Sequence, residues 1–316
     1  MEITTAKIIA VLVLGLGSFF TGMIPAGISE STRQRHPLTI SCLLCFGAGV
    51  LLATSLIHML PEAREDLPQF SELFLCAGFF IVYFVDEIVH FFYGNGNQGH
   101  HRQTQTYGTE QTSLLRSHDE LRGGDGELDP RRCCGDTENP RMCHVSHTEP
   151  CNKTSSGFIG LLCALFVHSL LEGLAIGLQK NSVQVLLLLG AVASHKFVVG
   201  FCLGAELCAA GRGLRAHAAC VALFAGGSAA GIGIGAGLEA VQTVQSSIAV
   251  PIMQALAAGT LLYVTVSEVL PRERARFHER KRWSGPAQLT AVMVGFAAMY
   301  LKTTFLYVIF SCHDHE

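Results

Sequence analysis

The chain has 316 residues, of which 49% are hydrophobic and only 15% are charged. Soluble domains carry about 25% charged residues, so the composition argues against an ordinary cytosolic enzyme and excludes a disordered chain or a disulfide-stapled mini-protein. A formal net charge of −3 gives no sign of the basic surface that nucleic acid requires. The composition therefore indicates a polytopic membrane protein embedded in the lipid bilayer.

Eight segments are apolar and long enough to cross a bilayer as helices, which takes about 20 residues. In chain order they cover residues 6–28, 38–60, 71–93, 157–179, 184–209, 217–239, 249–270 and 287–310. The first run is too long for a cleaved signal peptide, and no small-residue cleavage site stands out. We expect an all-α fold with eight transmembrane helices.

The distribution of Lys and Arg predicts the orientation. Seventeen of the 22 basic residues fall in alternate connections between the predicted helices. These connections are 29–37, 94–156, 210–216 and 271–286. Because cytoplasmic loops carry an excess of Lys and Arg, both termini are predicted to be extracytoplasmic.

Residues 94–156 form the only long polar stretch of the chain. They lack the apolar residues needed to bury a core, so we expect a disordered cytoplasmic loop. The prediction is one membrane domain, built from helices 1–3 in residues 1–93 and helices 4–8 in residues 157–316.

The predicted loop carries two short patterns. Glu110 with Leu114 and Leu115 fits an acidic dileucine motif that would bind sorting adaptors. Several soft-ligand side chains would capture metal weakly, because their spacing matches no closed zinc module. They are Cys133, Cys134, Cys143, His144 and His147.

Ionisable residues inside membrane helices are costly and by default mark function. His168 and Glu172 are four residues apart, so they share one face of a helix, and His195 lies in the next helix. Small residues on both helices permit a close approach that would bring the three together. Because imidazole and carboxylate both bind divalent transition ions, these residues are candidate metal ligands. Hydrogen-bonded packing within the bundle is the alternative.

Ser169 and Lys196 lie directly beside these candidates in the sequence. Ser169 is a further candidate residue of the same metal site. An ammonium group cannot ligate a cation. Lys196 therefore either neutralises a buried carboxylate or places a fixed positive charge where a second ion would bind.

Three more ionisable residues near helix ends are candidates for contact with an ion. His58 and Glu62, at the outer end of the second helix, would collect ions at an entrance, although a solvated helix end explains them equally well. Glu268, near the cytoplasmic end of the seventh helix, either ligates an ion on the exit side or pairs with the nearby Arg272.

Three stretches resemble the ZIP family of zinc and iron transporters. They are HSLLEGLAIGLQ at 168–179, the HK pair at 195–196 and AAGTLLYVTVSEVLPRE at 257–273. The resemblance covers essentially the whole chain. The HK pair is similar to the small subfamily with short, His-poor loops found in animal plasma membranes.

The resemblance implies that the protein is not an enzyme and needs no cofactor. It would carry divalent metal, chiefly Zn²⁺, into the cytoplasm by alternating access. The protein would act as a homodimer in the plasma membrane. The dileucine pattern would allow it to cycle through endosomes. His168, Glu172 and His195 would bind the ion, together with Glu268. Some relatives place acidic residues where this chain has Lys196 and Val199, so we expect one ion per cycle.

Two other functions fit the same residues. An intramembrane zinc hydrolase would use the His and Glu cluster to hold a catalytic ion, although the chain lacks HExxH. A metal-sensing receptor would signal through residues 94–156. Since imidazole and carboxylate accept several ions, the residues do not discriminate zinc from iron, manganese or cadmium.

Overall fold

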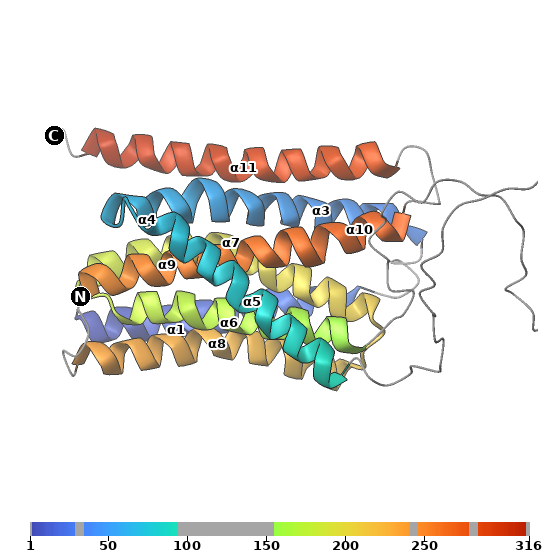
Figure 1. The fold of residues 1–316 in the computed structure, drawn as a ribbon, viewed down its shortest axis with the longest axis horizontal. Coiled ribbons are helices and arrows are strands. Elements are labelled where there is room, and N and C mark those ends of the chain that lie inside the picture. Colours follow the sequence, from blue (N-terminus) through green and yellow to red (C-terminus); the bar gives the residue numbers. More distant parts are fainter. Residues whose placement is uncertain (1, 29–34, 94–154, 241–245, 278–283, 314–316) are drawn as a thin grey trace, which may run out of the picture. The chain divides into compact units, whose positions relative to one another are not determined.

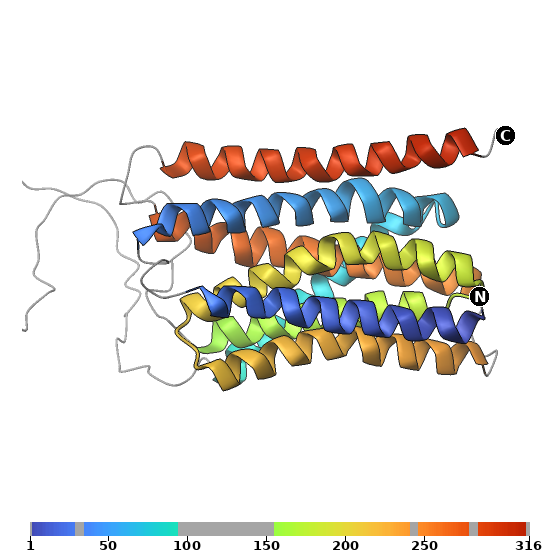
Figure 2. The same cartoon turned by 180° about the vertical axis from the view of Figure 1, so that it is seen from behind.

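The computed structural model describes residues 2–28, 35–93, 155–240, 246–277 and 284–313. These residues are helical throughout, apart from short connections, and they contain no strand. The helices run side by side as a bundle, and the ends of α1 and α11 nearest the two chain termini lie at the same end of it (Figures 1 and 2). The expected all-α fold is confirmed for this part of the chain.

Seven helical stretches are long and apolar enough to cross a membrane within the described residues. They are α1 (Ile3–Gly27), α3 with α4 (Pro37–Asp66), α5 (Ser71–Tyr93), α6 (Ser155–Gly177), α7 (Ser182–Ala209), α8 (Leu214–Ala240) and α9 with most of α10 (Ile248–Ala275). The expected eighth segment, 287–310, forms α11 (Ser284–His313). This long helix lies against α3 but is not among the seven.

Glycine allows two pairs of helices to pack backbone against backbone. A methyl group built on Gly231 of α8 would lie 2.8 Å from the amide nitrogen of Leu174 in α6, and one on Gly235 would lie 2.6 Å from the carbonyl oxygen of the same residue. A methyl group on Gly200 of α7 would lie 3.0 Å from the carbonyl oxygen of Ser18 in α1. Small residues at such interfaces let membrane helices approach closely. The glycines therefore bring α8 against α6 and α1 against α7.

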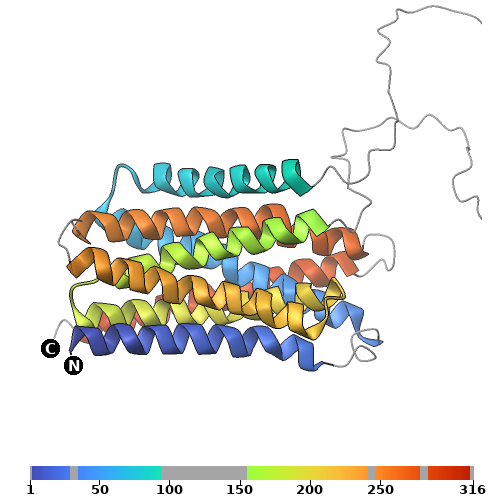
Figure 3. The same cartoon turned by 90° about the horizontal axis from the view of Figure 1, so that it is seen from below.

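A second set of glycines joins α3 to α11 and α5 to α9. Added methyl groups on Gly49 and Gly295 would collide with the backbone of the facing helix in the first pair, and the same holds for Gly78 and Gly259 in the second. Figure 3 shows α5 at one face of the bundle and α1 at the opposite face. The elements that carry the candidate ligands, α6 and α7, lie between these faces.

Two helices are interrupted by a six-residue π-helical segment. One, Thr54–Met59, joins α3 (Pro37–Ala53) to α4 (Leu60–Asp66), and the other, Val264–Val269, joins α9 (Ser246–Tyr263) to α10 (Leu270–Phe277). Each is followed directly by Leu-Pro. Proline has no N–H and clashes with the preceding turn, so a widened turn accommodates it. The two segments carry His58 and Glu268, both of which were singled out from the sequence.

Candidate metal centre

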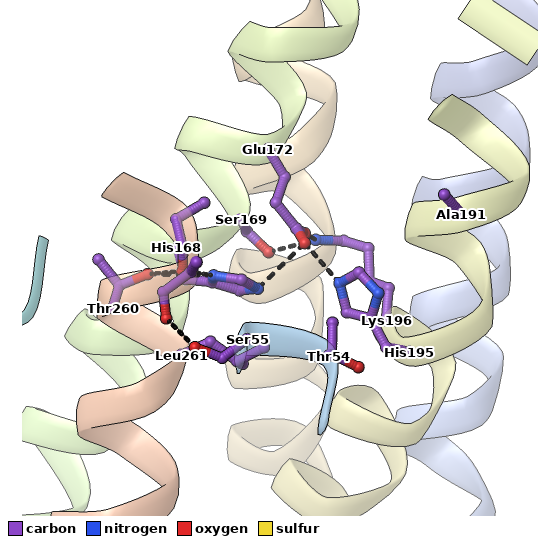
Figure 4. Close-up of polar contacts among 12 residues, drawn as sticks. Thr54, Ser55, His168, Ser169, Glu172, Ala191, His195, Lys196, Thr260 and Leu261 are labelled. Carbon is purple, nitrogen blue, oxygen red and sulfur yellow. Dashed lines mark hydrogen bonds and ion pairs between the residues drawn. The ribbon is translucent and has the colours of Figure 1, made fainter. Parts of the chain in front are cut away.

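Three ligand-type side chains from two helices converge at one buried point. The Oε1 atom of Glu172 lies 3.2 Å from Nε2 of His168, one turn earlier on α6, and 2.6 Å from Nε2 of His195 on α7. Each of the three residues is at most 2% exposed. Figure 4 shows the two imidazole rings reaching the carboxylate from opposite sides. The predicted convergence of the three side chains is present, but the small residues expected to cause it face other helices. Glycines of α6 pack against α8, and Gly200 and Gly204 of α7 pack against α1.

His168 is held by a third helix, α9. Its Nδ1 atom lies 3.0 Å from the carbonyl oxygen of Ala257 and 3.1 Å from the hydroxyl of Thr260, and that hydroxyl donates to the same carbonyl at 2.7 Å. A carbonyl oxygen can only accept, so Nδ1 carries the proton that it donates. Nε2 is then left with its lone pair directed at the cluster. Hydrogen bonds of this kind fix the tautomer and orientation of histidines that bind metal.

The donor set fits a divalent transition ion. His168, Glu172 and His195 are the one group of three or more such residues within the described chain, with one ligand atom from each lying within 4.8 Å of the others. Zinc is bound by imidazole nitrogen and carboxylate oxygen at about 2.0–2.2 Å. An ion placed between the two Nε2 atoms and Oε1 therefore requires only small side-chain movements.

Lys196 occupies the other side of the same carboxylate. Its ammonium group donates to Oε2 of Glu172 at 3.0 Å and to the hydroxyl of Ser169 at 2.7 Å, and it lies 4.9 Å from the ring centre of Phe224. Lys196 is fully buried. Burying an unpaired charge is strongly unfavourable, so the ion pair stabilises both groups in this position. The Ser169 hydroxyl thus accepts from Lys196.

One cavity links the cluster to the residues expected at the entrance. It is small, with a volume of about 10 Å³, and its wall includes His58, Glu62, Gln254, Glu172 and His195. The structure thus brings His58 and Glu62 into the same space as two of the candidate ligands. Gln254 of α9 was missed by the sequence analysis, although an amide inside an apolar helix is a signal that could have drawn attention to it.

Of the remaining predicted site residues, the structure describes Glu268, which does not join the cluster. Glu268 lies in the π-helical segment after α9 and pairs with Arg272, one of the two roles expected for it. The loop patterns lie outside the described residues: Cys133, Cys134, Cys143, His144, His147, Glu110, Leu114 and Leu115.

The bundle and its buried cluster define a helical membrane protein that can bind a divalent metal ion between two of its helices. The sequence profile described as ZIP zinc transporter matches residues 4–303. The chain therefore belongs to the ZIP family, whose members are transporters and not enzymes.

Curated relatives agree with this assignment. The chain is 27% identical to zinc transporter ZIP3 of Homo sapiens over 304 residues, which covers 86% of this chain and 90% of that protein. It is 27% identical to zinc transporter ZIP1 of Mus musculus, with 87% and 84% covered. It is 26% identical to zinc transporter ZIP2 of Homo sapiens, with 85% and 87% covered.

Proposed function

We propose that the protein carries Zn²⁺ from the extracytoplasmic side into the cytoplasm and binds the ion at His168, Glu172 and His195. The observation that carries the proposal is the meeting of two imidazole Nε2 atoms at one carboxylate oxygen inside the helix bundle. Zinc is named by the family and by the curated relatives. Membership in a family of transporters favours a carrier over the zinc hydrolase considered above.

The proposed path begins in the cavity beside His58 and Glu62. An ion that enters there exchanges water for the carboxylate of Glu62 and the imidazole of His58. It then reaches the buried ligands, of which Glu172 and His195 line the same cavity. Neutral imidazole is required for metal binding, so uptake weakens at acid pH. Glu268 would act on the release side, where Arg272 competes for its carboxylate.

The orientation belongs to the same proposal. We place α11 across the membrane as the eighth helix and both chain termini on the extracytoplasmic side, as the bias of Lys and Arg predicts. Residues 94–156 would then be a cytoplasmic insertion in a single membrane domain. Its Cys and His residues would capture metal weakly, and its dileucine pattern would bind sorting adaptors.

Lys196 supports a stoichiometry of one ion per cycle. Its ammonium group lies within hydrogen-bonding distance of Glu172 and Ser169, and a second cation at that point would face a fixed positive charge. We further propose that the chain acts as a homodimer in the plasma membrane, as the resemblance to its subfamily implied.

Uptake of ⁶⁵Zn²⁺ by vesicles that contain the purified protein tests the proposal. Saturable uptake is expected for the native chain and is expected to be lost in His168→Ala and Glu172→Ala. Glu87→Gln, which removes an exposed carboxylate on α5, is the matched control. Unchanged saturable uptake in either Ala variant would overturn the site assignment, and a native chain that moves no metal would overturn the function.

A further inference from the structure

The face of α7 that carries His195 bears further side chains along the rest of the helix. Val199, Cys202 and Glu206 follow His195 at intervals that keep them on the same side of the helix. At 1.5 Å per residue, Glu206 lies about 16 Å along the helix from His195. α7 therefore extends one line of side chains from the metal centre to its own C-terminal end.

A second cavity lies along this line. It is small, with a volume of about 10 Å³, and α7 contributes Val199, Cys202, Leu203 and Glu206 to its wall. The first cavity contacts earlier turns of α7, at Leu188, Ala191, Val192 and His195. The two cavities thus follow one another along α7, with the metal centre in the wall of the first.

The second cavity is apolar except for two groups. Its other wall residues are leucines and valines from α3, α6, α7 and the π-helical segment Val264–Val269: Leu44, Leu51, Leu161, Leu165, Val199, Leu203, Val264 and Val269. Most of them belong to the main hydrophobic core of the bundle. Such a lining gives a dehydrated cation no ligands, and an ion moved into it from water would lose its hydration without compensation.

The two exceptions are both suited to binding a soft divalent cation. Cys202 is a free thiol, and it and Glu206 are each only 5% exposed. They are four residues apart, the same spacing as His168 and Glu172, so one ion can reach both side chains. Thiolate and carboxylate are both ordinary zinc ligands, and thiolate selects soft ions such as Zn²⁺ and Cd²⁺ over Mn²⁺.

We propose that Cys202 and Glu206 form a release-side metal site, which receives the ion after it leaves His168, Glu172 and His195. This proposal rests on the proposed carrier function. It explains how an ion passes through the part of the bundle whose cavity is lined by leucines and valines. Cys202 binds as the thiolate, its proton passes to water on the release side, and Glu206 supplies a carboxylate oxygen. Water completes the coordination of the ion as the cavity opens.

The first test measures binding and does not depend on transport. Co²⁺ is added to the purified full chain in which His168 and His195 are Ala and the loop residues Cys133, Cys134, Cys143 and Cys151 are Ser. A thiolate-to-cobalt charge-transfer absorption is expected, and Cys202→Ser is expected to abolish it. Glu206→Gln should weaken Co²⁺ binding by at least tenfold, as loss of a ligand or its support typically does.

Cys220→Ser is the matched control, because Cys220 is partly buried in α8 and lines neither cavity. It should leave the absorption unchanged. The proposal is overturned if the absorption persists in Cys202→Ser. It is also overturned if correctly folded protein that retains Cys202 shows no absorption.

The second test uses flux into vesicles and leaves the metal centre intact. Glu206→Gln should lower the maximal rate of Zn²⁺ uptake roughly fivefold while the outside half-saturation concentration stays the same, because the substitution acts after binding. Cys202→Ser should lower the rate for Cd²⁺ more than for Mn²⁺. Glu206→Asp should restore most of the Zn²⁺ rate.

The two proposals fail in different ways. A native chain that moves no metal overturns the carrier function, and the cobalt absorption then still decides whether the release-side site exists. Normal transport with unchanged or raised rates in Cys202→Ser and Glu206→Gln overturns the release-side site alone.

Discussion

Lys196 and Glu172 form a buried ion pair in which the ammonium group takes one carboxylate oxygen and leaves the other to two imidazoles. Oε2 accepts from Lys196, whereas Oε1 faces His168 and His195. An incoming ion can therefore bind Oε1 without displacing the ammonium group from Oε2. The pair holds the Glu172 carboxylate in position beside the two imidazoles.

Removing this cation should destabilise the protein without metal more than the protein with metal. Lys196→Met leaves the Glu172 carboxylate buried without its fixed partner, which costs about 3–5 kcal/mol for a broken buried pair. Zn²⁺ restores a positive charge beside the carboxylate. Thermal unfolding in detergent should show a lower Tm for Lys196→Met and a larger rise in Tm on addition of Zn²⁺ than in the native chain.

The comparison for this experiment is Lys180→Met, which removes an exposed lysine between α6 and α7. Its Tm and its response to zinc should match the native chain. Equal zinc-induced shifts in the native chain and Lys196→Met would show that the ammonium group does not compensate Glu172.

Reversing the charge at this position should create a place for a second ion. Lys196→Asp replaces an ammonium group with a carboxylate beside Ser169 and Glu172, and carboxylate oxygen is an ordinary ligand for zinc. Metal content of the purified protein after equilibrium dialysis should rise by one Zn²⁺ per chain. Lys196→Met should not show this gain, and an unchanged metal content in Lys196→Asp would contradict the proposal that the ammonium group stands where a second ion would bind.

The contact between His168 and α9 should contribute to affinity. Thr260→Val removes the hydroxyl that lies 3.1 Å from Nδ1 of His168 and that donates to the Ala257 carbonyl. Loss of a group that orients a ligand costs roughly tenfold in metal affinity. Calorimetric titration with Zn²⁺ should show this weakening. Thr290→Val on the exposed side of α11 makes the same chemical change and should leave the affinity unaltered.

The first cavity should govern capture of the ion and not its later passage. Glu62→Gln removes a negative charge from the cavity wall but leaves the three ligands in place. The outside half-saturation concentration for Zn²⁺ should rise severalfold at low ionic strength, and the maximal rate should change little. Glu65→Gln, an exposed carboxylate on the same helix, provides the control. A fall in maximal rate with an unchanged half-saturation concentration would contradict an entrance role.

The positions of most helices in the sequence follow from composition, because a chain crosses a bilayer as long apolar helices. The expected segments 6–28, 71–93 and 184–209 differ from α1, α5 and α7 by only a few residues at each end. The second and seventh segments run further than expected, to Asp66 and Phe277, since a π-helical turn carries each helix past its proline. Hydrophobicity alone carries no signal for such a turn.

The candidate site was also predicted only in part from the sequence. The spacing of His168 and Glu172 already placed them on one face, because a helix repeats every 3.6 residues. The approach of His195 was expected, but glycines of α6 and α7 face α8 and α1, so its 2.6 Å contact with Glu172 depends on the packing of the whole bundle. The carbonyl of Ala257 and the amide of Gln254 could not be assigned to the site, since both come from α9, which lies far away in the sequence.

The sequence by itself determined the membrane class, the bias of basic charge, the family resemblance and the ligand pair on α6, because each depends on composition or on spacing within one helix. Only the tertiary structure decided which carboxylate oxygen faces the imidazoles, that Lys196 takes the other, and that Cys202 and Glu206 line a second cavity. The reason is geometric: contacts between helices depend on their rotation and separation, which here are set by glycines at facing positions and not by any local motif.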